Sequence, residues 1–277
     1  MAARCSEGMF PPAASAPWIR PDFGIAGVGA LMSTRAGGVS RGALAELNLG
    51  TAVGDDADAV AENRRRFAQE LGGVPIFLNQ VHGTRVVRLG AVEAEAACQG
   101  AALIEADACF TTAGGIACVV QVADCLPVLL AAPEGRGVAA AHAGWRGLSA
   151  GVLEACATKL AAASRCELYE LKAWLGPCIG PRQFEVGADV LAGFGIDPDA
   201  GHPRFVLRPS SSGKWLADLA GLAADRLAAI GLRAVQIDGR CTVENDSRFF
   251  SFRRDRPGHG NSGRLAAAVW IDRRVGR

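Results

Sequence analysis

Three residues carry side chains that bind transition metals or activate nucleophiles, and each stands where a strand-like segment meets a turn. They are His82 in LNQVHGT, Cys125 in VADCLP and His142 in AAAHAGWRG, and a glycine or proline follows each within two positions. Such junctions on a rigid scaffold are where proteins commonly present chemistry. One Cys with two His is a recognised catalytic zinc set, which leaves a fourth tetrahedral position for water or substrate.

The same residues allow other interpretations. A lone Cys in an apolar run is usually a packed small residue, and a lone His is more often hydrogen-bonded within the structure than a ligand. A metal-free site is also open, in which His142 activates the Cys125 thiolate. Asp124 stands in an otherwise apolar stretch and needs a partner, usually a buried arginine, for which Arg146 is the candidate.

Three further side chains are candidates for substrate binding. Arg35 in STRAGGVS and Arg146 in GWRG offer bidentate forks to a phosphate, and the Gly-rich turn around Arg35 lets backbone N–H groups approach an anion. Asn48 is a candidate for hydrogen bonding to a ribose hydroxyl or a base edge. Trp145 and Phe249 have rings that can stack on a purine, although core packing is the simpler expectation for both.

The elements that must position these residues are a mixture of helices and short strands. Apolar spacing, acidic starts and terminal glycines predict helices over 55–73, 145–164 and 214–232, with a short one near 187–194. Strand-like runs cover 27–34, 75–80, 84–89, 107–112, 116–122, 127–132, 137–142, 171–176, 204–209, 234–239, 249–254 and 264–271. Many of these runs are apolar on both faces, which indicates sheets covered on both sides.

This pattern predicts an α/β fold, a single layered domain with mixed β-sheets flanked by helices. We expect that catalytic domain over residues 18–277, after a loose Ala/Pro/Ser-rich tail at 1–17. At the end of the segment FFSFRRD, Arg253 and Arg254 are expected to pair with Asp255 or Glu185 rather than with substrate.

Composition narrows the function class. The formal charge of +1 argues against nucleic acid or an anionic membrane surface as the main partner, because both demand a basic excess. The longest apolar run contains Gln121, Asp124 and Pro127, a set that a membrane-spanning helix tolerates poorly. The N-terminal stretch lacks the apolar segment of a signal peptide. Nine cysteines without a C-x-x-C motif are typical of a reduced, cytoplasmic protein.

Longer motifs connect the sequence to a known family. The segments, which run in family order from about 33 to 271, are STRAGGVSRGALAELNLG, VGDDADAVAENRRRF, LNQVHGTRVV, ADACFTT, VADCLPVLL, AAHAGWRGL, GPCIGPRQFEVG, RFFSFRRD and SGRLAAAVWI. With these segments the chain resembles the bacterial laccase-domain family, also labelled polyphenol oxidase, purine nucleoside phosphorylase or peptidoglycan editing factor. The resemblance covers nearly the whole chain, and no departure occurs at the metal-ligand positions.

The resemblance implies a zinc (or copper) site whose ligands are His82, Cys125 and His142. It also implies phosphorolysis of the purine nucleosides adenosine, inosine and methylthioadenosine, with phosphate as the second substrate, and deamination of adenosine. A multicopper oxidase is improbable on residue count, because four histidines in total cannot supply both a blue-copper and a trinuclear centre.

Three alternatives stay open at this point. One is a Cys-His amide hydrolase that edits peptidoglycan precursors by removing a wrongly incorporated amino acid. Another is weak polyphenol oxidation by a single copper ion. The third is a metal-dependent binding protein without turnover. The sequence does not fix the oligomeric state.

Overall fold

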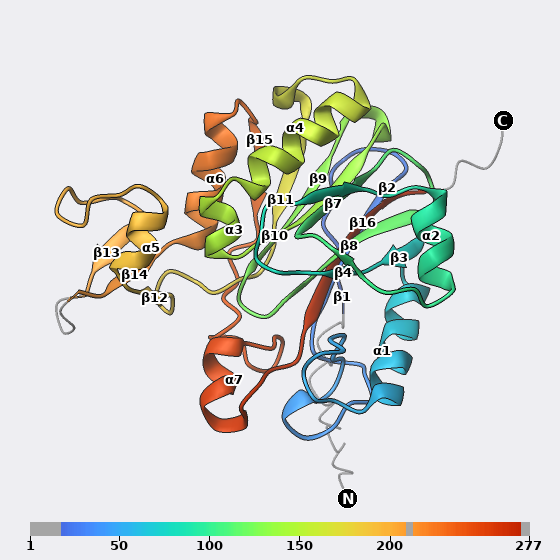
Figure 1. Ribbon diagram of the computed structural model, residues 1–277, viewed down its shortest axis with the longest axis horizontal. Coiled ribbons are helices and arrows are strands. Elements are labelled where there is room, and N and C mark those ends of the chain that lie inside the picture. The colour runs from blue at the N-terminus through green and yellow to red at the C-terminus, as the bar shows by residue number, and fades with distance from the viewer. Residues whose placement is uncertain (1–17, 209–212, 273–277) are drawn as a thin grey trace, which may run out of the picture.

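Two stacked sheets form the centre of the molecule in this computed structural model, which describes residues 18–208 and 213–272 (Figure 1). The tail expected at 1–17 lies outside the described residues. The strands of the first sheet are, in spatial order, β1 (Trp18–Ile19), β2 (Val28–Ser33), β16 (Leu265–Ile271), β8 (Ile116–Val122) and β3 (Val74–Ile76). Those of the second are β15 (Ala234–Ile237), β11 (Lys172–Leu175), β9 (Leu126–Ala131), β10 (Val138–Ala143), β7 (Ala108–Thr111) and β5 (Val86–Arg88).

Both sheets are mixed, which confirms the predicted α/β class. Most neighbours are antiparallel, as in β16 with β2 and β8, whereas β3–β8, β5–β7 and β11–β15 are parallel. The last described strand therefore lies between strands from the first half of the chain.

Seven helices occur in the described residues, and some of them cover the outer faces of the paired sheets. They are α1 (Ala57–Gln69), α2 (Ala91–Cys98), α3 (Trp145–Ser149), α4 (Val152–Ser164), α5 (Ala188–Gly193), α6 (Leu219–Ala229) and α7 (Phe252–His259), with short 3-10 turns η1 (Gly42–Leu44), η2 (Pro133–Gly135) and η3 (Leu168–Glu170). Helices α4 and α6 pack on the six-stranded sheet, and α1 covers the far side of the five-stranded sheet (Figure 1). No helix in 18–208 or 213–272 has both the length and the apolar character to cross a bilayer.

Small side chains let the two sheets approach each other. Along β16, Ala267 and Val269 face the space between the sheets, whereas Ala268 and Trp270 face the α1 side. Such alternation is the period-two signature of a strand, and both faces are apolar because both are covered. Strand β10 (VAAAHA) is buried throughout and carries one polar side chain, His142, at its carboxyl end.

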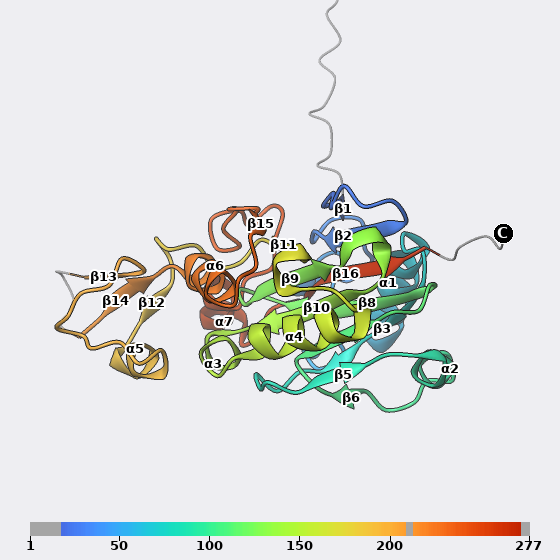
Figure 2. The same ribbon diagram turned by 90° about the horizontal axis from the view of Figure 1, so that it is seen from above.

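A smaller unit projects at one end of the molecule (Figure 2). It contains the three-stranded sheet of β12 (Glu185–Val186), β14 (Trp215–Ala217) and β13 (Phe205–Leu207), together with α5. A separate two-stranded pair of β4 (Leu78–Asn79) and β6 (Ile104–Glu105) lies beside the main sheets.

Several local predictions need correction. The helix expected over 145–164 is broken into α3 and α4 because Gly151 adopts a left-handed φ of 97°. The segment 214–232 begins as strand β14, and its helix starts only after Asp218 caps it. The strand expected over 249–254 is wrong: Ser251 accepts from the Arg254 N–H and begins α7 instead. Helix α2 was missed, since all its residues are partly or fully exposed and form no apolar face.

Candidate metal centre

His82 lies in the loop after β4, and a buried carboxylate holds that loop in place. The N–H groups of Val81, His82 and Gly83 donate to Asp107 at 3.1, 2.9 and 2.7 Å. His82 has a φ of 62°, a left-handed conformation that a non-glycine residue adopts only when its surroundings impose it. The loop backbone is therefore clamped around Asp107, which leaves the exposed imidazole of His82 projecting at a defined position.

The same carboxylate orients His142. This histidine is the penultimate residue of the buried strand β10 and is 3% exposed, and its Nδ1 lies 2.8 Å from Oδ1 of Asp107. Because Nδ1 of His142 donates to the Asp107 carboxylate, Nε2 of the same imidazole is the nitrogen available as a ligand. A ligand histidine whose second nitrogen donates to a carboxylate is the usual arrangement around protein-bound zinc.

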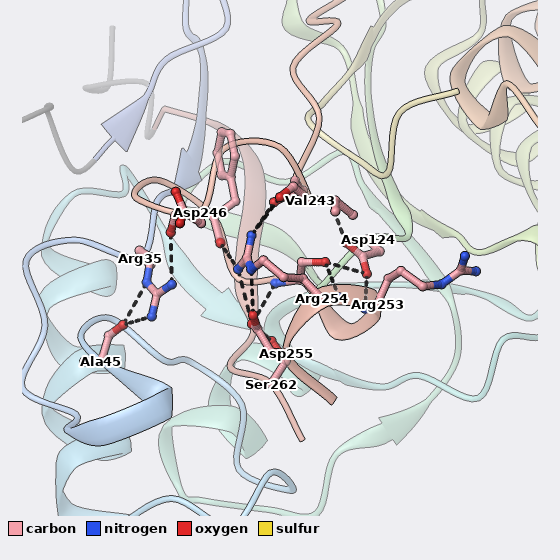
Figure 3. A network of polar contacts seen from close by, with 12 residues as sticks. Arg35, Ala45, Asp124, Val243, Asp246, Arg253, Arg254, Asp255 and Ser262 are labelled. Carbon is pink, nitrogen blue, oxygen red and sulfur yellow. Dashed lines mark hydrogen bonds and ion pairs between the residues drawn. The ribbon is translucent and has the colours of Figure 1, made fainter. Parts of the chain in front are cut away.

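Cys125 lies in the turn between β8 and β9 and directly follows Asp124, whose side chain is held by hydrogen bonds. Asp124 has a φ of 85°, and its side chain accepts from Thr242 Oγ1 (2.5 Å), Ser251 Oγ (3.0 Å) and the backbone N–H of Arg253 (2.6 Å). Figure 3 shows this cluster, with Arg253 beside the carboxylate. Two hydroxyls and an amide thus satisfy Asp124, which anchors the turn that presents the cysteine.

The three candidate ligands converge. Their donor atoms all lie within 4.8 Å of one another, with Sγ of Cys125 3.8 Å from Nε2 of His82. Tetrahedral zinc with ordinary Zn–S and Zn–N bonds separates such atoms by roughly 3.6 Å. The two imidazole rings meet edge to face, with centroids 4.8 Å apart. The donor types therefore fit a single metal ion, and the separation of Sγ and Nε2 is close to the tetrahedral value.

Electrostatics prepares the cysteine for a cation. Burial alone would raise the pKa of the Cys125 thiol, but the charge and hydrogen bond of His142, aided by His82, lower it to about 6. Burial would lower the pKa of His142, but Cys125 and Asp107 raise it to about 9. These opposite shifts favour a thiolate facing an imidazolium in the metal-free pair, and a bound cation would replace the imidazolium proton.

A hollow of about 120 Å³ opens beside the cysteine. Its lining combines Cys125 and Asp124 with the aromatic rings of Trp145, Phe184 and Phe252. Arg253 lies at its rim, where the guanidinium donates to the backbone carbonyls of Gln183 and Glu185. Flat apolar walls next to a metal ligand suit a planar heterocycle.

Arg146 and Arg35 occupy different places. Arg146 is exposed and lies over the Trp145 ring at 4.4 Å, near the hollow, and it forms no ion pair with Asp124, contrary to the alternative expected from the sequence. Arg35 lies apart, since its guanidinium donates to the Ala45 and Asp246 carbonyls (Figure 3). The guanidinium also lies 4.7 Å from the centre of the Phe250 ring. Arg146 therefore lies against a ring that lines the hollow of Cys125, whereas Arg35 lines another hollow.

Asn48 is fully buried, and its side chain has no hydrogen-bonding capacity left for a substrate. It donates to the Gly50 carbonyl and to Asp55, and it accepts from the N–H groups of Gly50 and Arg264. The predicted direct contact with substrate is therefore corrected to a role in joining two segments of backbone.

The paired-arginine prediction is confirmed in part. Arg254 pairs with Asp255 at 2.7 Å, whereas Arg253 forms no ion pair with Glu185, whose carboxylate pairs with Arg208. Phe249 is fully buried as expected, and Trp145 is half-buried at the hollow.

Asp107 is a candidate site residue that the sequence did not reveal. It is 0% exposed and joins the His82 loop to His142 across 35 positions of sequence. Its only local signal is a charged residue just before the buried strand β7, a position that requires a polar partner.

Known proteins are similar in sequence to this chain over most of its length. Residues 29–272 match the family model described as multi-copper polyphenol oxidoreductase laccase. A protein of Pseudomonas aeruginosa named purine nucleoside phosphorylase is 44% identical over 92% of this chain and 98% of its own length. The purine nucleoside phosphorylase YfiH of Escherichia coli K12 is 42% identical over 88% and 94%.

Solved structures agree with the fold. Neisseria meningitidis protein NMB0706 superposes with a TM-score of 0.81 at 42% identity, covering 93% of this chain and all of its own. YlmD from Geobacillus stearothermophilus reaches a TM-score of 0.84 at 29% identity, covering 94% and 97%.

Proposed function

Because the chain belongs to the family described as multi-copper polyphenol oxidoreductase laccase, several of whose members are named purine nucleoside phosphorylases, we propose that it is a zinc-dependent enzyme of that activity. It would cleave adenosine, inosine and methylthioadenosine with phosphate, and it would also deaminate adenosine. The observation that carries the proposal is the convergence of His82, Cys125 and His142 beside an aromatic hollow.

The residues around the candidate metal centre would have different roles in this reaction. A zinc ion held by the three donors would supply Lewis-acid activation of a nucleophile or of a departing group. Asp107 fixes the protonation and the orientation of His142 through the 2.8 Å contact. Trp145, Phe184 and Phe252 offer faces on which a purine can stack.

A direct assay tests this function. Purified zinc-loaded protein is incubated with adenosine, inosine or methylthioadenosine, with and without phosphate, and the products are separated by chromatography. We expect free base to appear only when phosphate is present. We expect inosine to form from adenosine when phosphate is absent. Cys125→Ala should abolish both, whereas Cys98→Ala, at an exposed cysteine on α2, should behave as the unmodified protein. No product from zinc-loaded protein would refute the proposal.

A Cys-His amide hydrolase acting on peptidoglycan precursors is the second candidate, because the Cys125 thiolate faces the His142 imidazolium. Chelation distinguishes the two. A zinc enzyme loses activity on chelation and recovers it with zinc, whereas a cysteine amidase survives chelation and is inactivated by thiol alkylation.

Copper oxidation is the weaker alternative. Among the described residues, one group of three donors has metal-binding spacing, which allows a single copper but not a multinuclear centre. Oxidation of a phenol by copper-loaded protein at a rate comparable with nucleoside turnover would favour it.

A further inference from the structure

A second hollow has a different lining, part of which belongs to the segments that lead to the candidate metal ligands. It measures about 150 Å³ and is bordered by the turn 50–53, by Gln80, by Gln121 and by Arg264. Gln80 precedes His82 by two positions, and Gln121 stands in β8 just before the Cys125 turn. The backbone that forms this hollow therefore continues directly into the segments that carry two of the ligands.

Arg264 is the charged side chain in this lining, and no carboxylate neutralises it. Among residues 18–208 and 213–272 it forms no ion pair, and one guanidinium nitrogen donates to the Ser262 and Gly263 carbonyls. Burial lowers its pKa, while the negative charges of Cys125 and Asp124 act in the opposite direction. Its guanidinium lies 5.9 Å from the ring of Phe252, which lines the first hollow. Arg264 thus brings positive charge to the space between the two hollows.

The turn opposite Arg264 offers backbone donors. None of the described residues accepts from the N–H groups of Thr51, Ala52 or Val53. Successive unpaired N–H groups next to an arginine are a recurrent way of binding a phosphate.

Asn48 holds these two parts together, since its carbonyl oxygen accepts from both Gly50 and Arg264. The turn and Arg264 also pack closely, since a Cβ added to Gly50 would lie only 2.7 Å from Cγ of Arg264. The pairing joins segments 216 positions apart, so the donors are fixed before any ligand arrives.

The Gln80 and Gln121 amides are already committed. Gln80 pairs with the backbone of Gln121 on both sides, and Gln121 donates to the Leu49 carbonyl. Neither side chain competes with Arg264 for an anion, and no carboxylate lines the hollow to repel one.

We infer that the hollow formed by Arg264 and the turn 50–53 is a subsite for a phosphate dianion beside the metal ligands. The inference deepens the proposed function and rests on it for the identity of the reaction. In phosphorolysis a phosphate oxygen forms a bond to C1′ of the ribose as the bond from C1′ to the base nitrogen breaks. The electron pair leaves with the base, which takes up a proton, and the products are free base and ribose 1-phosphate. Arg264 would hold the attacking phosphate.

Titration calorimetry with zinc-loaded protein tests the subsite. Inorganic phosphate and AMP are titrated separately, and the tighter of the two identifies the source of the phosphate group. Arg264→Gln should weaken binding roughly 10- to 100-fold, the cost of a charge-assisted hydrogen bond, and Arg264→Lys should weaken it less. Arg41→Gln is the matched control, because Arg41 is exposed and its side chain donates to none of the described residues. Unchanged affinity for both probes in Arg264→Gln overturns the inference.

Kinetics separates this inference from the proposed function. Arg264→Gln should raise the KM for phosphate by the same factor and leave the KM for the nucleoside unchanged, which a merely structural role would not do. If phosphorolysis proceeds with an unaltered KM for phosphate, the subsite is wrong and the function stands. If no nucleoside is cleaved but phosphate binding depends on Arg264, the subsite stands and the function is wrong. Should Arg264→Gln fail to fold, judged by circular dichroism, the same comparison with Arg264→Lys decides.

Discussion

Replacing Asp107 by asparagine tests how the centre is built. The buried carboxylate accepts on one oxygen from His82 N–H and His142 Nδ1, and on the other from the N–H groups of Val81 and Gly83. An asparagine keeps the shape but turns one of these oxygens into an NH₂ donor. In either orientation, two donors that had an acceptor then face another donor.

The loss of stability in Asp107→Asn can be worked out from those contacts. Each hydrogen bond to a charged group contributes about 1.5–3 kcal/mol, so two lost bonds cost about 3–6 kcal/mol. Total stability of a domain is roughly 5–15 kcal/mol, so Asp107→Asn should unfold at clearly lower denaturant concentration. Zinc affinity should fall roughly 10- to 100-fold, as for other carboxylates that orient a ligand histidine.

The stabilisation that Asp107 provides depends on pH in a defined direction. Burial would raise the pKa of Asp107, but hydrogen bonds from His142 and from the backbone lower it further than burial raises it. Its stabilisation is therefore complete above the unfolded pKa of about 3.9 and is lost as the pH falls through the folded pKa. The stability difference between the zinc-free native protein and Asp107→Asn should shrink as the pH falls below about 4. It should also shrink as the pH rises from about 6.5 to about 9, because Asp107 helps to raise the pKa of His142 and that stabilisation is lost over this range.

Urea unfolding and metal analysis after dialysis against a weak chelator measure both effects. Asp199→Asn is the matched control, because Asp199 is exposed and its side chain accepts from none of the described residues. An Asp107→Asn variant with native zinc content and an unchanged unfolding midpoint would refute the clamp.

Three further predictions concern the ligands themselves. Cys125→Ala and His142→Ala should each remove zinc and turnover while circular dichroism stays native, and full activity in either would contradict a shared site. Gly144→Ala places a Cβ 2.8 Å from Cδ2 of His82 and 3.1 Å from Sγ of Cys125, so the zinc content of this variant should fall. The control Gly258→Ala, which has open space around its Cβ, should keep the native zinc content. With the pKa of Cys125 lowered to about 6, zinc-free protein should be alkylated by iodoacetamide with a midpoint near that pH and not near the ordinary value of about 8.5. Zinc should protect the thiol, and a midpoint near 8.5 would argue against the His142 pairing.

Particular residues show how far local sequence reasoning reaches. The buried strands β8, β9, β10 and β16 lie within a residue of the expected ranges at each end because their apolar runs are continuous. The segment 249–254 misled, since its phenylalanines suggest a strand although Ser251 caps a helix. The capping bond competes with strand pairing, and the outcome depends on Asp124, to which both Ser251 and Arg253 donate.

The sequence by itself determined the chemistry available and the approximate positions that carry it. Residue type makes a cysteine and two histidines candidate ligands, and turn-formers place them at strand ends. The near-zero net charge disfavours a polyanionic partner. Only the tertiary structure decided which groups meet. Asp107 reaches His142 across 35 positions, Asp124 reaches Thr242 across 118, and Asn48 reaches Arg264 across 216. Local propensity contains no information about such partners, because strand register and the stacking of two sheets bring distant segments together, and burial then requires each polar group to be satisfied.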